Sequence, residues 1–247
     1  MSTTTQPPKP KRRWYQFGLR TLLLVMLVSC FAFAWIGVRL QRASENRDRV
    51  AAVEKPVAEI EKLGVMVVKE YEQLRSPTWL EALFDDPGDE DDPTGVLTVS
   101  DVDFFEGDAT DADLEHVKSL THLKNLNLRS TNVTDAGLEH LKWLTKLEDL
   151  RLGDTNVTDT GMEHLKGLTN LEALHIGQTN ISNAGLEHLK GLTSLQFLDL
   201  TNTDVTDAGL ENLSGLTQLK LVLLDGTQVT DEGVEKLQQA LPNCHIW

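Results

Sequence analysis

Residues 138–161 read LEHLKWLTKLEDLRLGDTNVTDTG, and residues 162–185 read MEHLKGLTNLEALHIGQTNISNAG. The two stretches align without a gap, and their period is 24 residues. Self-similarity at a fixed period of this length is typical of repeat architectures, in which each unit buries its apolar side only against its neighbours. Five full copies follow one another without insertion, at 114–137, 138–161, 162–185, 186–209 and 210–233.

Each unit has two halves with different apolar periods. In the first half, MEHLKGLTNL, apolar residues recur three positions apart, as on the buried face of a short helix. In the second half they alternate, so Leu174 and Ile176 are expected on one side of a strand and His175 on the other. Stacked units therefore predict an α/β solenoid, with a parallel sheet along the concave side and helices along the convex side.

The turns into and out of the helices carry recognisable end signals. Four threonines, each followed by aspartate, are expected to cap the helices, with the carboxylate at the positive end of the helix dipole. These threonines are Thr134, Thr158, Thr206 and Thr230. Gly167, Gly191 and Gly215 are expected to end the helices in a left-handed conformation.

An uncharged apolar run, LLLVMLVSCFAFAWIGV at 22–38, precedes the repeats. A helix of that length measures about 25 Å, which is at the short end of what spans a bilayer. Arg20 and Arg39 bracket the run, and five basic residues without an acidic one come before it. The positive-inside rule therefore predicts a basic cytoplasmic tail (1–20), a transmembrane signal-anchor helix (21–39) and a repeat domain outside the cytoplasm.

The alternative for this segment is a cleaved signal peptide. Ala32-Phe33-Ala34 has the A-x-A form of a cleavage site, and the repeats would then be secreted after cleavage near Ala34. The apolar run is longer than the core of an ordinary signal peptide and continues past this site, which favours an uncleaved anchor. The repeat domain is exported in both interpretations.

The pattern L-x-x-L-x-L-x-x-T-x-V-T-D-x-G-L, over residues 96–247, resembles the leucine-rich-repeat family. It includes a degenerate first unit, in which Val99, Val102 and Phe104 occupy the apolar positions. The Thr-Asp turn is similar to the ribonuclease-inhibitor-like subtype. With its anchor, the chain resembles membrane-anchored repeat proteins of planctomycete-like bacteria. The resemblance implies a solenoid that binds a partner but does not identify the partner, because one fold serves many functions.

Residues 40–95 are expected to form a juxtamembrane helix, an N-terminal cap and an acidic loop. The helix should kink or divide at Pro56. A short strand at 64–68 and a helical turn at 79–84 are expected to cover the first repeat, as solenoids require. The acidic loop at 85–93 is interpreted as solvated rather than as a calcium site, because its spacing is not that of an EF-hand.

Charge is unevenly distributed along the chain. Residues 1–39 carry +6, and residues 40–247 carry 17 basic and 38 acidic side chains, or −21, which sum to the net −15. A domain of that charge repels phosphate, so nucleic acid is an improbable partner. Two cysteines cannot form a disulfide framework. No P-loop, G-x-S-x-G or H-E-x-x-H motif occurs, so we expect neither a cofactor nor a catalytic site.

The main candidate site is the concave face, where alternate strand residues point away from the core. Phe197, Leu221 and Leu223 place apolar side chains where small or polar ones are expected, which predicts a contact patch. The alternative is that residues 244–247 fold over them as a cap. The candidate partner-binding residues are Asn125, Asn127, Arg129, Asp149, Arg151, His175, Phe197, Asp199, Leu221, Leu223 and Asp225.

Two features of the helical face receive a different interpretation. His116, His140, His164 and His188 recur every 24 residues, beside Glu–Lys pairs. We attribute them to duplication rather than to a metal site, because helix axes about 8–10 Å apart keep three such side chains from converging. Trp143 stands where other units have Gly or Ser, and we expect it to be exposed.

The sequence thus predicts a single-pass membrane protein that is not an enzyme. Its exported solenoid would bind a protein partner or a cell-envelope component through the concave face, without a cofactor. One alternative is a structural or self-assembling envelope protein without a discrete ligand. A second is an enzyme whose residues are scattered over the concave face. The sequence does not determine the oligomeric state.

Overall fold

The computed structural model describes residues 41, 44, 48, 50–63, 65–73, 95–105 and 107–247. The predicted tail and transmembrane helix, the helical turn at 79–84 and the acidic loop at 85–93 lie outside these residues. No helix among the described residues is long and apolar enough to cross a bilayer. The chain divides into two units, Met1–Arg47 and Asp48–Trp247, and the second contains all the repeats.

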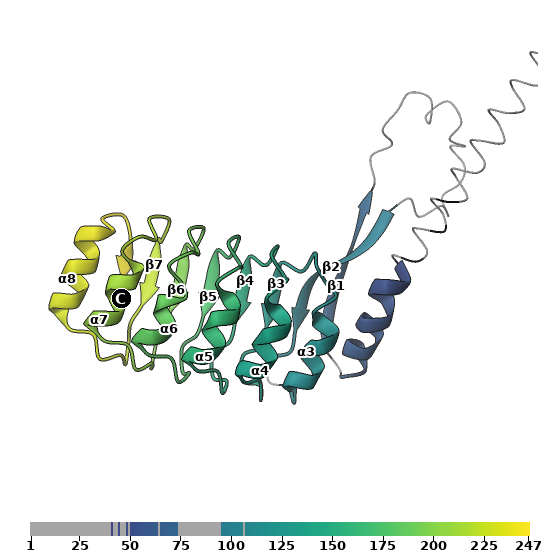
Figure 1. Cartoon of the computed structure of the whole chain (residues 1–247), viewed down its shortest axis with the longest axis horizontal. Coiled ribbons are helices and arrows are strands. Elements are labelled where there is room, and N and C mark those ends of the chain that lie inside the picture. The colour runs from purple at the N-terminus through teal and green to yellow at the C-terminus, as the bar shows by residue number, and fades with distance from the viewer. Residues whose placement is uncertain are drawn as a thin grey trace, which may run out of the picture. The chain divides into compact units, whose positions relative to one another are not determined.

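One sheet runs through the second unit, and its strand order follows the sequence (Figure 1). β1 is antiparallel to β2, and every later strand is parallel to the one before it. This arrangement confirms the predicted α/β solenoid with a parallel sheet. The strands are β1 (Met66–Gln73), β2 (Gly95–Asp103), β3 (Asn125–Asn127), β4 (Asp149–Arg151), β5 (Ala173–His175), β6 (Phe197–Asp199), β7 (Leu221–Leu223) and β8 (His245–Ile246).

Short helices line the other side of the arc (Figure 1). In three units, a single α-helical turn continues directly as a 3₁₀ turn, because a 24-residue unit leaves little chain for its helix. The helices are α3 (Asp111–Val117), α4 (Asp135–Leu138), α5 (Asp159–Met162), α6 (Asn183–Glu187), α7 (Asp207–Leu210) and α8 (Asp231–Ala240). The 3₁₀ turns are η1 (Glu139–Leu141), η2 (Glu163–Leu165) and η3 (Glu211–Leu213).

The core lies between the sheet and the helices and repeats with the sequence. The central residues of neighbouring strands, such as Leu150, Leu174 and Leu198, lie in register and are fully buried. Val102 and Phe104 of the degenerate unit are also buried, and Val102 pairs with Leu126 of β3. The same apolar positions therefore form one continuous core through the stacked units.

The Thr-Asp-x-Gly turn joins each unit to the next. The carboxylate of Asp159 accepts hydrogen bonds from the backbone N–H (2.7 Å) and hydroxyl (2.6 Å) of Ser182, and from the N–H of Gly185 (2.9 Å). A Cβ at Gly185 would lie 2.5 Å from Asp159 Oδ1, so only glycine admits this close approach. Equivalent two-bond contacts join Asp111 to Thr134, Asp135 to Thr158, and Asp207 to Thr230.

The predicted helix caps are present in most units. The side chains of Thr134, Thr158 and Thr230 each accept a backbone N–H of the helix that follows. Thr206 makes no such bond. Its hydroxyl instead accepts a hydrogen bond from Asn183, which stands where the other units have aspartate.

The predicted left-handed stops at Gly167, Gly191 and Gly215 are wrong, because none of them has a positive φ. The 3₁₀ turns end in right-handed helical residues such as Lys142 and Lys166, so the chain leaves the helix without a left-handed residue. The chain instead reverses just after each strand. Positive φ angles occur there, at Ser130, Asp154, Gln178, Asn202 and Gly226.

The N-terminal end of the solenoid is covered by a helix over residues 50–62 and by β1. The helix continues through Pro56, so the prediction that it divides at this residue is wrong. Val57 and Ile60 are buried in the core cluster, and this packing offsets the hydrogen bond that proline removes. β1 covers part of the predicted strand at 64–68 but extends further, to Gln73.

Candidate binding surface on the concave sheet

Two rows of side chains run across the strands on the concave side, because strand residues alternate between core and surface. Unlike the buried residues between them, members of one row differ from strand to strand. The first row is Asp101, Asn125, Asp149, Ala173, Phe197, Leu221 and His245. The second row is Asp103, Asn127, Arg151, His175, Asp199 and Leu223.

A hollow of about 400 Å³ lies on this side, over β2 to β6. We call it the polar hollow. Five of the eleven residues that line it are among the candidate partner-binding residues predicted from the sequence. The other six are Asp103, Phe105, Gly153, Gly177, Thr201 and Gln178, and all of these except Gln178 lie at a multiple of 24 residues from Asn127 or Arg129. The lining residues are Asp103, Phe105, Asn127, Arg129, Arg151, Gly153, His175, Gly177, Gln178, Asp199 and Thr201.

The two arginines of the hollow are held differently. Arg151 donates to Asp149, with Nη2 2.9 Å from Oδ2, and this hydrogen bond raises the pKa of Arg151. Asp149 lies outside the hollow but fixes the arginine at its edge. Arg129 lies 6.0 Å above the centre of the Phe105 ring and forms no ion pair with any residue that the structure describes. Arg129 therefore offers a guanidinium to a ligand.

The carboxylates of the hollow are oriented by the backbone. Asp103 Oδ1 accepts the N–H of Phe105 and Asp199 Oδ1 accepts the N–H of Thr201, each at 2.9 Å. Each carboxylate has a second oxygen for which no bond occurs within the described part of the chain. The hollow thus presents fixed groups of both charges, which suits orientation of a polar ligand.

His175 joins the hollow to the neighbouring strands. Its ring centre lies 4.5 Å from that of Phe197, and its Nε2 lies 3.9 Å from Asp149 Oδ1. Burial lowers the pKa of His175, and this effect exceeds the opposing attraction of Asp149. The imidazole is therefore predominantly neutral at pH 7 and packs as an aromatic ring.

An apolar strip continues from His175 toward the C-terminus. Phe197, Leu221 and Leu223 are half-buried on the concave side. By strand alternation, Trp247 lies on the same side as Leu223, and it is 73% exposed. We call Phe197, Leu221, Leu223 and Trp247 the C-terminal apolar strip.

The C-terminal segment does not fold over this strip, so the predicted alternative of a covering cap is wrong. His245 and Ile246 instead form β8, which pairs in parallel with Leu221 and Val222 of β7. Cys244 is buried, and Ile246 packs against the core. Residues 234–247, which follow the fifth full unit, therefore extend the sheet by one strand and leave the strip open.

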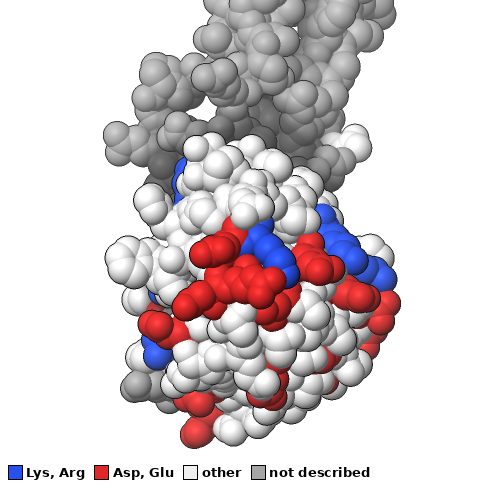
Figure 2. All heavy atoms as spheres, turned by 90° about the vertical axis from the view of Figure 1, so that its left-hand side faces the viewer, with Lys and Arg blue, Asp and Glu red and all other residues white. Residues whose placement is uncertain are grey.

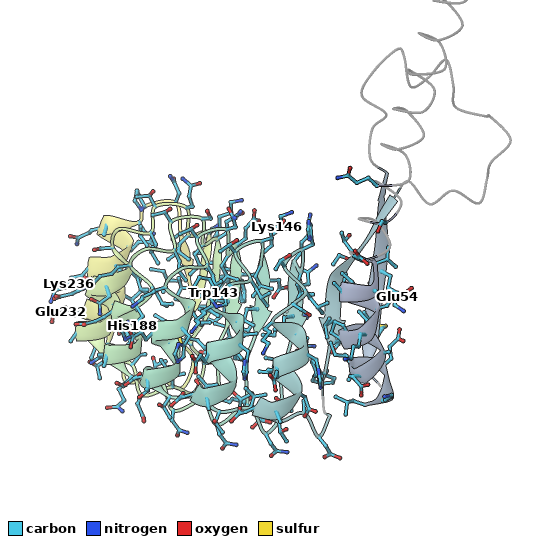
Figure 3. The ribbon with its side chains drawn as sticks, turned by 45° about the vertical axis from the view of Figure 1, so that its right-hand side comes forward. Glu54, Trp143, Lys146, His188, Glu232 and Lys236 are labelled. Carbon is cyan, nitrogen blue, oxygen red and sulfur yellow. The ribbon has the colours of Figure 1, made fainter. Side chains whose placement is uncertain are left out.

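The other predicted site residues lie around these two surfaces. Asn125 donates to Asp101 at 2.6 Å on the neighbouring strand, outside the hollow. Asp225 is exposed two residues after Leu223. On the helical face, Trp143 (Figure 3) is 68% exposed as expected. Lys142 Nζ lies 5.6 Å from the centre of its ring.

Residues 94–245 match the family model of the leucine-rich repeat region, which covers more than half of the chain. The chain therefore belongs to the leucine-rich-repeat family. No curated protein matches it.

The solved structures similar to this chain include two internalins from Listeria monocytogenes. Internalin (inlF) is 26% identical with a TM-score of 0.46, over 53% of this chain and 36% of the internalin. Internalin C2 is 25% identical with a TM-score of 0.47, over 60% of this chain and 70% of the internalin. This chain thus spans about a third of the first internalin.

Proposed function

We propose that this protein is a leucine-rich-repeat binding module that holds a protein partner against its concave sheet. The observation that carries the proposal is the continuity of two unlike surfaces on that sheet. The polar hollow of about 400 Å³ meets the C-terminal apolar strip at the contact between His175 and Phe197. A partner segment would gain orientation from the first surface and buried apolar area from the second.

The rigidity of the site supports binding. Strands β2 to β7 keep an unbroken register, and bonds such as Asp149–Arg151 and Asp199–Thr201 fix the polar side chains before a ligand arrives. Preorganised groups lose little conformational freedom on association. We propose no catalytic role for this surface.

We further propose, from the sequence, that residues 21–39 anchor the protein in a membrane, with 1–20 in the cytoplasm and the repeats outside. Protease treatment of intact cells should then degrade the repeat domain, and carbonate extraction should leave the full chain in the membrane pellet. Repeats that resist protease would contradict the topology. A mature protein beginning near Trp35 would show that the segment is a cleaved signal peptide instead.

The binding proposal is tested by capture from solubilised envelope with the full chain and two variants. One variant carries Phe197→Asp and Leu221→Asp in the apolar strip. The control carries Trp143→Asp, an exposed aromatic position on the helical face. We expect the parent and the control to retain the same protein and the strip variant to lose it, with unchanged circular dichroism in all three. Equal capture by all three folded proteins would contradict a concave site.

Self-assembly without a partner is tested in the same preparation. A chain whose mass corresponds to one copy in detergent supports a binding module. Ordered oligomers that form without any other protein, and persist in the strip variant, would favour a structural role.

A further inference from the structure

Carboxylates border the C-terminal apolar strip. Asp199 lies beside Leu223 in register on the adjacent strand, and Asp225 follows Leu223 by two residues. Neither carboxylate forms an ion pair with any residue that the structure describes. The strip is therefore an apolar surface bordered on two sides by carboxylates that form no ion pair within the described residues.

The whole C-terminal end of the solenoid has the same sign. Residues 201–247 contain seven acidic and two basic side chains, a formal charge of −5. Both lysines are engaged, Lys236 with Glu232 at 2.9 Å and Lys220 with Gln196 at 2.6 Å. Figure 2 shows acidic side chains gathered across this end, and Figure 3 shows Glu232 and Lys236 on its outer side.

We propose that the C-terminal apolar strip receives a cationic segment of the partner protein. One or two bulky apolar side chains of that segment would contact Phe197, Leu221 and Leu223, and flanking Lys or Arg residues would face Asp199 and Asp225. This inference rests on the proposed function and adds the chemistry of the partner to it.

The size of the strip agrees with such a segment. From β6 to β8 the strip crosses two strand spacings, or about 10 Å, and Leu221 and Leu223 lie about 7 Å apart along β7. That area accommodates one or two large side chains rather than a broad apolar interface. Charge then contributes strongly to the choice of partner segment, because the negative potential favours cationic segments and disfavours acidic ones.

The same potential disfavours a second copy of this chain as the occupant. Two identical C-terminal ends, each at −5, would repel each other at low ionic strength. A partner of opposite charge faces no such repulsion and would associate faster in dilute salt.

The test uses the full chain in phosphatidylcholine nanodiscs and three fluorescent 12-residue peptides, with empty nanodiscs as the blank. The first peptide flanks Leu and Phe with lysines, the second replaces the lysines by glutamates, and the third keeps the lysines but replaces Leu and Phe by serine. Anisotropy at about 50 mM salt should show the first binding at least tenfold more tightly than the other two. Equal affinity of the lysine and glutamate peptides would overturn the proposal.

Variants separate the contribution of charge from that of apolar contact. Asp199→Asn with Asp225→Asn should weaken the lysine–apolar peptide about tenfold and reduce its salt dependence, and Leu223→Ser should weaken it at any salt concentration. Glu163→Gln with Glu187→Gln, on the helical face, removes the same number of charges and should leave binding unchanged. If the aspartate variants bind as the parent does, the charge assignment is wrong.

The peptide experiment tests the cationic selectivity and the capture experiment tests the concave site, so each can give a negative result without the other. A partner lost from the Phe197→Asp, Leu221→Asp variant, together with no preference for the lysine peptide, would leave the concave site in place and refute its cationic selectivity. Failure of both experiments would refute the proposed function itself.

Discussion

The helical face and the concave sheet are built from the same five units, yet their exposed side chains follow opposite rules. On the helices, Glu115–Lys118, Glu139–Lys142 and Glu163–Lys166 repeat as ion pairs of 2.8, 3.0 and 2.9 Å. On the sheet, residues that face each other across neighbouring strands differ at nearly every step. Exposed residues that repeat thus reflect the scaffold, and those that depart from the repeat mark the candidate site.

The largest loss of stability is expected for a substitution on the buried side of the sheet, and a smaller one for a substitution on the concave side. Leu174 is fully buried in the middle of β5, and Leu174→Ala should lower the free energy of unfolding by about 2–5 kcal/mol, since it leaves a cavity in the core. Leu221→Ala, on the concave side, should cost clearly less because Leu221 already contacts solvent. Urea unfolding followed by circular dichroism measures both. Equal losses would mean that the apolar strip is part of the core.

A smaller effect is expected where the units join. Gly185→Ala forces a Cβ against Asp159 Oδ1 and Ile181, so it should cost about 1–3 kcal/mol of stability. A Cβ at Gly215 would meet no atom within 4 Å, and Gly215 has no positive φ, so Gly215→Ala is the matched control. The control should be neutral or stabilising by up to about 1 kcal/mol. A neutral Gly185→Ala would refute the role of the inter-unit carboxylate.

The pH dependence of stability that arises from His175 in the polar hollow should be smaller still. Burial lowers the pKa of His175 in the folded protein below its ordinary value of 6.5, so the folded state resists protonation. The stability associated with the neutral ring is therefore complete above about pH 6.5 and is lost as pH falls through the folded pKa. NMR titration of the His175 ring should give a pKa below 6.5, and His175→Gln should lose less stability between pH 7.5 and 5 than the parent. A raised pKa would mean that Asp149 dominates instead.

The smallest effect is expected on the helical face. Trp143→Ser should change the free energy of unfolding by less than about 0.5 kcal/mol, because the indole is 68% exposed and the equivalent residue in other units is Gly or Ser. Thermal denaturation measures this change. A large loss, or loss of the captured partner, would assign a function to this face.

Much of the fold could be predicted because the repeat contains no insertion. A gapless period places Leu150, Leu174 and Leu198 in one core column, and alternation then determines which strand residues face outward. The same offset also relates Ile246 to Val222, so the sequence contained the signal that the last unit continues the sheet. The alternative of a covering cap is wrong because residues 245 and 246 continue the register of the repeat and pair with β7.

Two features could not be obtained from the period alone. The helical ends did not need a left-handed glycine, because 3₁₀ turns take over the last helical turn, and this depends on local backbone geometry. The period places Gly153 and Gly177 in the same row as Arg129, but the shape of the polar hollow also depends on the contacts of Arg129 with Phe105 and of Arg151 with Asp149. Such contacts follow from side-chain conformation, which a repeat pattern does not specify.

The most direct measurement is photo-crosslinking in intact membranes, with a benzophenone amino acid placed at Phe197 in one protein and at Trp143 in another. Both positions carry an aromatic side chain accessible to solvent, one on each face of the arc. A concave binding module predicts a discrete crosslinked partner from position 197 and none from position 143. Crosslinks from position 143 alone, or identical products from both positions, would contradict it.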